Sequence, residues 1–148
     1  MKIGAIAGDI ACVESMLALK DVMVALGSPH LECRQDGAKI DATDRASYIM
    51  NTGIAALEQA DVALFIGTDI RHEAPLVNTR LRKAYLRNGT QTFNVGAAFD
   101  LTFPVTQLGD NPQVLNEIAA GNHPVAEALK NAKNPVIILG AGALARAD

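Results

Sequence analysis

The residues best placed for chemistry follow a short apolar run at positions 62–66, where the chain reads GTDIR over residues 67–71. A glycine at such a turn allows close backbone approach, and the amides at the start of the following helix could receive an anion. Asp69 and Glu73 place two carboxylates beside that helix end, where they favour the helix and repel a phosphate. Arg71 offsets only part of this charge. The pattern favours capping and ion pairing, with retained ligand binding as the alternative. The candidate binding residues are Gly67, Thr68, Asp69 and Arg71.

Residues 140–145, GAGALA, follow another apolar run and match the G-x-G-x-x-A pattern of dinucleotide-binding turns. That mechanism requires a following helix whose amino end meets the pyrophosphate, and an acidic residue about 20 positions later. We find neither in this sequence. We therefore interpret these residues as a tight turn between packed elements, with a nucleotide site as the alternative. A strand and turn that should continue into a helix also predict that the chain is a fragment of a longer polypeptide.

The histidines and cysteines offer little for catalysis. His30, His72 and His123 are far apart and share no metal-like spacing with acids or cysteines. We find no Ser–His–Asp or Cys–His grouping, so we predict no catalytic residue and no metal ligand. The two cysteines, Cys12 and Cys33, are too few for an all-cysteine zinc site or an ordinary iron–sulfur cluster. We predict that both are buried thiols in a reduced protein.

The composition is that of one domain with a sizeable core, since 49% of the 148 residues are hydrophobic. The net charge of −3 argues against a nucleic-acid partner. No apolar run approaches the ~20 residues of a membrane helix, so we predict no direct membrane insertion. We see no repeat and no long linker, so residues 1–148 are predicted to form a single α/β domain.

Strand-sized apolar runs alternate with helical patterns, which is typical of a parallel α/β sheet. The continuous run at residues 62–66 suits a strand covered on both faces. We predict a three-layer, doubly wound, mainly parallel sheet of Rossmann-like type. Its strands are expected at residues 2–7, 30–34, 62–66, 92–95, 103–106 and 136–139, with a polar loop at 35–45.

Proline and glycine mark the ends of the predicted helices. Asp9 is the expected N-cap of the first long helix, which Gly27 ends. The clearest helix begins at Pro75 and ends at Gly89. Four cations crowd its remaining surface; we interpret them as a solvated face, with a docking surface for a neighbouring domain as the alternative. They are Arg80, Arg82, Lys83 and Arg87.

Three segments are more specific than the general pattern: GTDIRHEAPL at residues 67–76, LGD at 108–110 and GNHP at 121–124. With the strand ADVALFI before the first, the chain closely resembles the C-terminal region of the large iron–sulfur subunit, the G subunit, of respiratory NADH–quinone oxidoreductase (complex I). The resemblance covers essentially the whole chain. That region is in turn similar to the molybdopterin-binding domains of molybdenum oxidoreductases such as formate dehydrogenase, which implies a molybdopterin-oxidoreductase-like fold.

The chain departs from the molybdenum enzymes at two places. Their turn usually reads Gly-Ser/Thr-Asn-Pro and their next strand ends in Asp-Pro-Arg, whereas here Asp69 and Ile70 replace Asn-Pro and NVG stands at residues 94–96. Both departures remove polar groups or geometry that the cofactor would use, and Asp69 adds an unfavourable charge. The resemblance therefore implies a domain that has lost its cofactor and keeps only a vestigial pocket at the turn after residue 66.

The resemblance implies a non-catalytic structural domain in the peripheral arm that passes electrons from NADH to quinone. It implies no cofactor in this chain, and iron–sulfur clusters in the N-terminal part of the parent subunit. The implied partners are that cluster-binding region and other subunits of complex I. The implied location is peripheral, at the cytoplasmic face of the bacterial inner membrane or on the mitochondrial matrix side.

Two other interpretations remain open at this point. One is a molybdopterin cofactor-binding domain of a molybdenum oxidoreductase. The other is the central domain of a thiamine-diphosphate enzyme, because those domains carry a strand and turn similar to ADVALFIGT.

Overall fold

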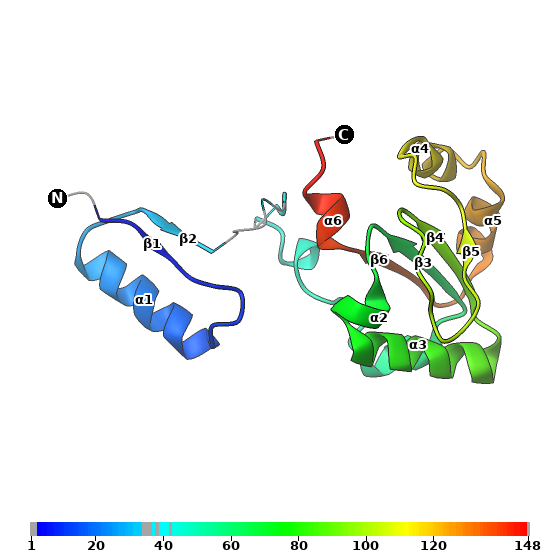
Figure 1. The fold of residues 1–148 in the computed structure, drawn as a ribbon, viewed down its shortest axis with the longest axis horizontal. Coiled ribbons are helices and arrows are strands. Elements are labelled where there is room, and N and C mark those ends of the chain that lie inside the picture. Colours follow the sequence, from blue (N-terminus) through cyan, green and yellow to red (C-terminus); the bar gives the residue numbers. More distant parts are fainter. Residues whose placement is uncertain (1–2, 34–36, 38, 42, 148) are drawn as a thin grey trace. The chain divides into compact units, whose positions relative to one another are not determined.

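The chain divides into two compact units, residues 1–38 and 39–148, each described by itself. The computed structural model describes residues 3–33, 37, 39–41 and 43–147 (Figure 1). Both units contain parallel strands connected by helices, so the predicted α/β class is confirmed. That the two units form one domain stays a prediction.

The first unit is a βαβ element. β1 (Ala5–Ile6) and β2 (Leu31–Glu32) pair in parallel, and α1 (Val13–Ala25) connects them. Both strands lie inside the predicted ranges and are shorter, and the outermost predicted residues, 2 and 34, lie outside the described part of the chain. The same is true of residues 35, 36, 38 and 42 of the predicted polar loop.

The C-terminal end of α1 lies where we predicted it, and the N-terminal end does not. Gly27 ends the helix as expected: its φ is +66°, and the amide of Ser28 donates to the carbonyl of Met23 at 3.0 Å. The predicted N-cap was wrong. Cys12, not Asp9, is the N-cap, because the chain turns once more before the helix begins.

The prediction of two buried thiols was also wrong. Cys12 and Cys33 are free and exposed. Cys12 lies at the start of α1 with its Sγ 3.0 Å from the hydroxyl of Ser15, a contact that lowers the pKa of the thiol. Cys33 directly follows the two-residue strand β2. A helix end and a short strand provide no apolar shell, so the usual burial of free cysteine does not apply here.

The second unit is built on a four-stranded parallel sheet with the strand order β5–β4–β3–β6. In its register Ala63 lies between Thr92 and Val136. Its elements are η1 (Arg45–Ser47), η2 (Ala55–Gln59), β3 (Val62–Ile66), α2 (Ile70–Glu73), α3 (Pro75–Asn88), β4 (Gln91–Val95), β5 (Thr106–Gln107), α4 (Gln113–Ala119), α5 (Pro124–Asn131), β6 (Pro135–Leu139) and α6 (Ala141–Leu144).

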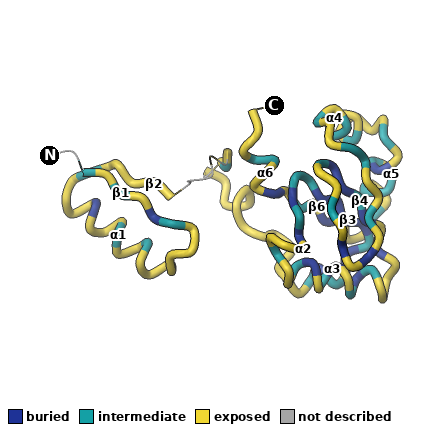
Figure 2. The backbone as a smooth tube through the Cα atoms, in the orientation of Figure 1, coloured by how far each residue is buried: buried dark blue, intermediate teal, exposed yellow. Residues whose placement is uncertain are grey.

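Helices cover both faces of this sheet, which confirms the doubly wound, three-layer prediction. Phe65 packs in one core cluster with Leu57 of η2 and Leu81 of α3. Val62 alternates to the opposite face, where it lines a hollow beside Ala128 of α5. In Figure 2 the buried residues of this unit gather along the central strands. No helix in the described residues has the length and apolarity needed to cross a membrane.

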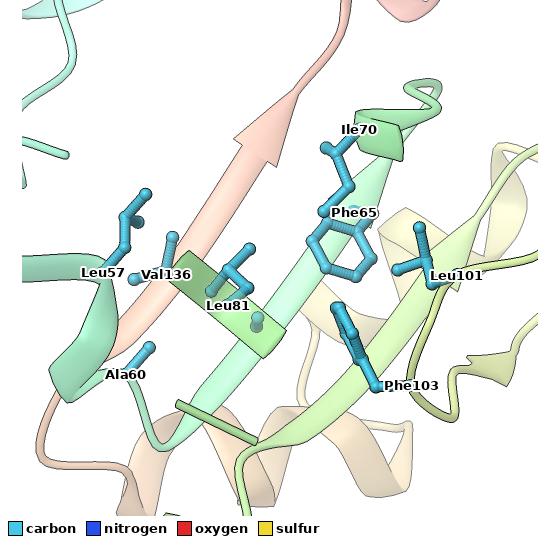
Figure 3. Packing of buried hydrophobic residues seen from close by; sticks show 9 residues of the cluster. Leu57, Ala60, Phe65, Ile70, Leu81, Leu101, Phe103 and Val136 are labelled. Atoms are coloured by element: carbon cyan, nitrogen blue, oxygen red, sulfur yellow. The ribbon is translucent and has the colours of Figure 1, made fainter. Parts of the chain in front are cut away.

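The main core lies between the sheet and α3 (Figure 3). Phe65 and Leu81 are fully buried in it. Phe99 meets the ring of Phe65 edge to face at 6.1 Å, and Phe103 stacks on Tyr85 at 5.8 Å. Phe99 and Phe103 come from the loop between β4 and β5, so the aromatic contacts hold that loop against the core.

The helix α3 begins and ends at the residues that the sequence predicts. Pro75 is its first residue, and Gly89 closes it with φ at +69° and its amide donating to the carbonyl of Tyr85. The four-residue helix α2, which lies between the turn at Gly67 and α3, was not predicted. Its fully buried Ile70 joins the core cluster, so tertiary packing stabilises a helix too short to form alone.

Two leucines on α3 allow a matched test of this core. Leu81→Ala removes a fully buried side chain and should lower the free energy of unfolding by about 2–5 kcal/mol. Leu86→Ala changes a side chain that is 62% exposed and should stay within about 0.5 kcal/mol of the unmodified protein. Urea denaturation followed by circular dichroism measures both, and equal losses would contradict the described packing of α3.

Candidate functional site

The carboxyl ends of β3, β4 and β6 meet on one edge of the sheet. β3 lies between β4 and β6, so the chain winds outward in opposite directions from this point. Open parallel sheets bind their ligands at such reversals. A cavity of about 680 Å³ lies there, and its walls include Gly67, Gly96 and Gly142 from the segments after the three strands.

The turn after β6 packs directly on the turn after β3. A Cβ added to Gly140 would lie 2.4 Å from the carbonyl oxygen of Gly67. Gly67 has φ at +58°, and a Cβ there would lie 2.8 Å from the amide nitrogen of Ala143. The amide of Gly140 donates to the carbonyl of Ile66 at 2.9 Å. These glycines permit two backbones to touch. The predicted tight turn without a following helix was wrong in part, because residues 141–144 form the short helix α6 directly after Gly140.

Two carboxylates accept hydrogen bonds from this turn. Glu73 reaches back so that Oε1 accepts from the amide of Asp69 at 2.7 Å and Oε2 from the hydroxyl of Thr68 at 3.1 Å. Asp69 is the N-cap of α2, and its Oδ1 accepts from the amide of Arg71 at 3.1 Å. Two amides that could have bound an anion therefore already donate to side chains of the protein. The capping that the sequence favours is present, on α2 rather than on α3.

Asp69 holds a negative charge on the wall of the cavity. Its Oδ2 lies 2.8 Å from Nδ1 of His72. This hydrogen bond is the main cause that lowers the pKa of Asp69 below its ordinary 3.8; burial opposes it, and the amide of Arg71 adds to it. The carboxyl is ionised at neutral pH because that pH lies far above its pKa. A phosphate group approaching the turn would meet this charge.

The ionisable side chains along the described wall of the cavity are mostly acidic. Asp69, Glu73 and Asp110 line it together with a single cation, Arg146. The wall is therefore net negative at neutral pH, and a concave surface of low dielectric concentrates such a field. This charge balance favours a neutral or cationic occupant over an anionic one.

The structure brings together three of the four predicted binding residues. Gly67, Thr68 and Asp69 line the cavity. Arg71 does not: its Nη1 donates to both the carbonyl and the Oδ2 of Asp100, each at 3.1 Å. The guanidinium thus connects α2 to the loop between β4 and β5. A binding role for these residues stays a prediction.

Residues 94–96, at the end of β4, form hydrogen bonds with the segment at residues 107–109. The side chain of Asn94 is almost fully buried, and its Nδ2 donates to the carbonyl of Ala97 at 3.0 Å and to Oε1 of Gln107 at 2.8 Å. The amide of Gly96, whose φ is +136°, donates to the carbonyl of Gly109 at 2.8 Å. These contacts tie β4 to the strand beside it, whereas the buried Oδ1 of Asn94 has no hydrogen-bond partner among the described residues.

The acidic and histidine side chains in the described part of the chain do not gather into a metal cluster. Among the described residues, no three His, Cys, Asp or Glu side chains converge as a metal site would require. His72 pairs with Asp69, and the ring of His123 accepts from the amide of Val125 at 3.2 Å and so caps α5. The wall of the cavity is thus partly apolar and partly acidic.

Three charged residues of the cavity, Glu73, Asp110 and Arg146, were not among the four predicted binding residues, although Glu73 was expected to support the helix. A signal for Asp110 existed, because Gly109-Asp110 follows a predicted strand and the carboxyl ends of parallel strands share one edge of a sheet. Arg146 gave no comparable signal. It reaches the cavity only because α6 folds back over Gly67, and that packing depends on contacts between segments far apart in sequence.

Comparison with known proteins gives one family for the whole chain. The model of the molybdopterin oxidoreductase family matches residues 1–148. A mitochondrial "NADH dehydrogenase [ubiquinone] iron-sulfur protein 1" from Solanum tuberosum is 46% identical over 97% of this chain. The G subunit of NADH-quinone oxidoreductase is 38% identical in Rickettsia felis and 37% identical in Rickettsia typhi, each over 99% of this chain. The chain spans 19% of the potato protein and 22% of each rickettsial one.

The contact between the two glycine turns is testable with a pair of identical substitutions. Gly140→Ala places a methyl group against the backbone of Gly67 and should destabilise the protein by about 1–3 kcal/mol. Gly8→Ala meets nothing within 4 Å and should change stability by less than about 0.5 kcal/mol. Hydrogen exchange of the β3 amides measures the effect on the second unit. Unchanged protection in Gly140→Ala would show that the two turns do not pack as described.

Proposed function

The chain belongs to the molybdopterin oxidoreductase family, and we propose that it is a non-catalytic structural domain of the G subunit of NADH–quinone oxidoreductase. Its parent enzyme, respiratory complex I, would pass electrons from NADH to quinone through groups held outside this chain. The names of the similar proteins support this assignment, since they describe the G subunit of NADH-quinone oxidoreductase and a mitochondrial NADH dehydrogenase iron–sulfur protein.

The observation that carries the non-catalytic role is the pairing of the turn after β3 with its own carboxylates. A molybdopterin cofactor is anionic, so its site needs free amide donors or cations. Here the amides of Asp69 and Arg71 donate to carboxylates, and three acids face one cation along the described wall of the cavity. These residues do not fit the cofactor. A scaffold that keeps the family's fold without its prosthetic group is consistent with this mismatch.

The electron carriers of the parent are proposed to lie elsewhere in the same polypeptide. The potato relative is named an iron–sulfur protein, and its length is about five times that matched here. The only cysteines of this chain, Cys12 and Cys33, are too few to hold an ordinary cluster. We therefore assign the iron–sulfur clusters of the parent to its N-terminal region.

The proposed partners are that cluster-binding region and other subunits of the peripheral arm. The proposed location is peripheral, on the cytoplasmic face of a bacterial inner membrane or on the matrix side of the mitochondrial one. The subunits named among the relatives support membership of such an assembly. Which of their surfaces contact this chain is part of the proposal.

A cofactor-binding domain of a molybdenum oxidoreductase is the second candidate. The family match and the position of the cavity at the reversal of strand order favour it. The charge of the cavity wall and the paired amides weigh against it. The third interpretation, a thiamine-diphosphate enzyme, has no such support, because the matching family is a different one.

The structural role is testable in the complete parent enzyme. Asp110→Asn removes a charge from the cavity wall without touching the core, and NADH–quinone turnover per assembled complex should not change. Leu81→Ala weakens the core and should lower the amount of assembled complex while turnover per complex stays the same. Native gels and iron content give the assembled amount. Loss of turnover in a fully assembled Asp110→Asn complex would contradict the proposal.

A further inference from the structure

Charge is distributed unevenly over this chain, and α3 carries a net positive charge on a chain whose net charge is negative. Within Pro75–Asn88 there are four cations and no acidic residue. Because the whole chain has 13 basic and 16 acidic residues, the remainder has nine basic against sixteen acidic, a net charge of −7. A helix of +4 on an otherwise acidic chain is more than a solvated surface of mixed charge requires. The cations are Arg80, Arg82, Lys83 and Arg87.

One carboxylate holds three of these cations in place. Glu58 of η2 is 19% exposed at its side chain, and its Oε1 accepts from Arg80 and, at 3.2 Å, from Lys83. Its Oε2 accepts from Arg87 at 3.1 Å. Asn88 fixes the same segment, since its Nδ2 donates to the carbonyl of Glu58 at 2.9 Å. One negative charge against three positive ones leaves a net charge of +2, on side chains that are already ordered.

Two exposed leucines accompany these cations. Leu76 is 75% exposed and Leu86 is 62% exposed. At helical spacing Leu76 falls in one row with the three cations that bind Glu58, and Leu86 falls in the adjacent row with Arg82. The residues of α3 that face the core are on the other side, where Leu81 is fully buried. The outward side of the helix therefore combines ordered cations with apolar side chains.

We propose that this outer face of α3, formed by Leu76, Arg80, Arg82, Lys83, Leu86 and Arg87, docks onto an acidic surface of another polypeptide in which apolar side chains lie among carboxylates. The inference rests on the proposed function for the existence of a partner, and the charge of the face determines the partner's chemistry. Cations already ordered by Glu58 lose little further freedom on binding, so the carboxylates of a partner gain from fixed donors.

A protein partner suits this face better than an anionic membrane. Lipid surfaces are bound by clusters of uncompensated Lys and Arg, and the contribution of each depends little on its position. Here Glu58 neutralises part of the charge and fixes the geometry, while Leu76 and Leu86 are spaced along the helix for separate apolar contacts. Arginine is also enriched in protein interfaces relative to the rest of the surface.

A defined probe tests the proposal on the complete chain. The probe is a fluorescent peptide of three Glu-Leu-Glu-Glu repeats, and its control is the peptide with Gln in place of every Glu. We expect saturable binding of the acidic peptide by fluorescence anisotropy, weakening as salt rises, and much weaker binding of the Gln peptide. Absence of saturable binding, or equal binding of both peptides, overturns the proposal.

Three double variants show where the probe binds. Arg82→Gln with Arg87→Gln should weaken binding about tenfold, or about threefold for each cation, within the range of exposed ion pairs. Leu76→Ser with Leu86→Ser should weaken it at least about threefold, because apolar contact is lost without any change of charge. Lys130→Gln with Lys133→Gln is the matched control, since it removes the same charge from positions outside α3 and should have little effect.

Each remaining outcome also decides the matter. If the Lys130/Lys133 control weakens peptide binding as much as the arginine variant does, the peptide is attracted by overall charge and the proposed docking surface is overturned. The same conclusion follows if the leucine variant binds the peptide as well as the unmodified protein does. Vesicles of phosphatidylglycerol that bind with the same dependence on these variants would assign the face to a membrane instead. If the leucine variant does not fold by circular dichroism, Leu86→Ala replaces it. Failure here leaves the proposed function untouched, because that function is tested by assembly and turnover of the parent enzyme.

Discussion

The hydrogen bond from the amide of Asp69 to the carboxylate of Glu73 determines what the edge of this sheet can do. It is 2.7 Å long and uses a donor that, in a ligand-binding turn of this type, would point at an anion. The capping of α2 by Asp69 uses a second donor. Glu73 belongs to the helix α2, which follows the turn, and Asp69 is the N-cap of that helix. Side chains of the protein itself therefore accept the hydrogen bonds that these two amides donate. The cavity therefore lies where open parallel sheets bind their ligands, and its described wall is net negative.

The parts of the fold that could be predicted from sequence are those with local causes. The run at residues 62–66 is β3, α3 begins at Pro75, and Gly27 and Gly89 end helices, because apolar runs, proline and glycine act through the nearest neighbours in the chain. The parts that were missed depend on distant contacts. α2 exists because Ile70 is buried in the core, and Arg71 lies outside the expected pocket because Asp100, 29 residues later, accepts from it.

The same distinction applies to the cavity. Capping by Asp69 and Glu73 was predictable, because a carboxylate near the start of a helix is stabilised by the positive end of the helix dipole. That Gly140 would touch Gly67 was not, because the two turns are brought together by the parallel pairing of β3 with β6. The two cysteines were predicted wrongly for a different reason. We expected burial because free cysteines are buried in most proteins, but Cys12 lies at a helix end and Cys33 beside a two-residue strand, and both are exposed. The average burial of a residue type does not take into account the helix or strand in which the residue lies.

The family assignment and the charge of the site together support our proposal that this domain keeps the architecture of its family without the ligand. The most direct measurement of that claim is a titration of the ¹⁵N-labelled protein with pyrophosphate, observed at the amides of Asp69 and Arg71. The account predicts no saturable shift of either resonance in the unmodified protein, and a saturable shift once Glu73→Ala and Asp69→Ala release the donors. Saturable binding at these amides in the unmodified protein would contradict it.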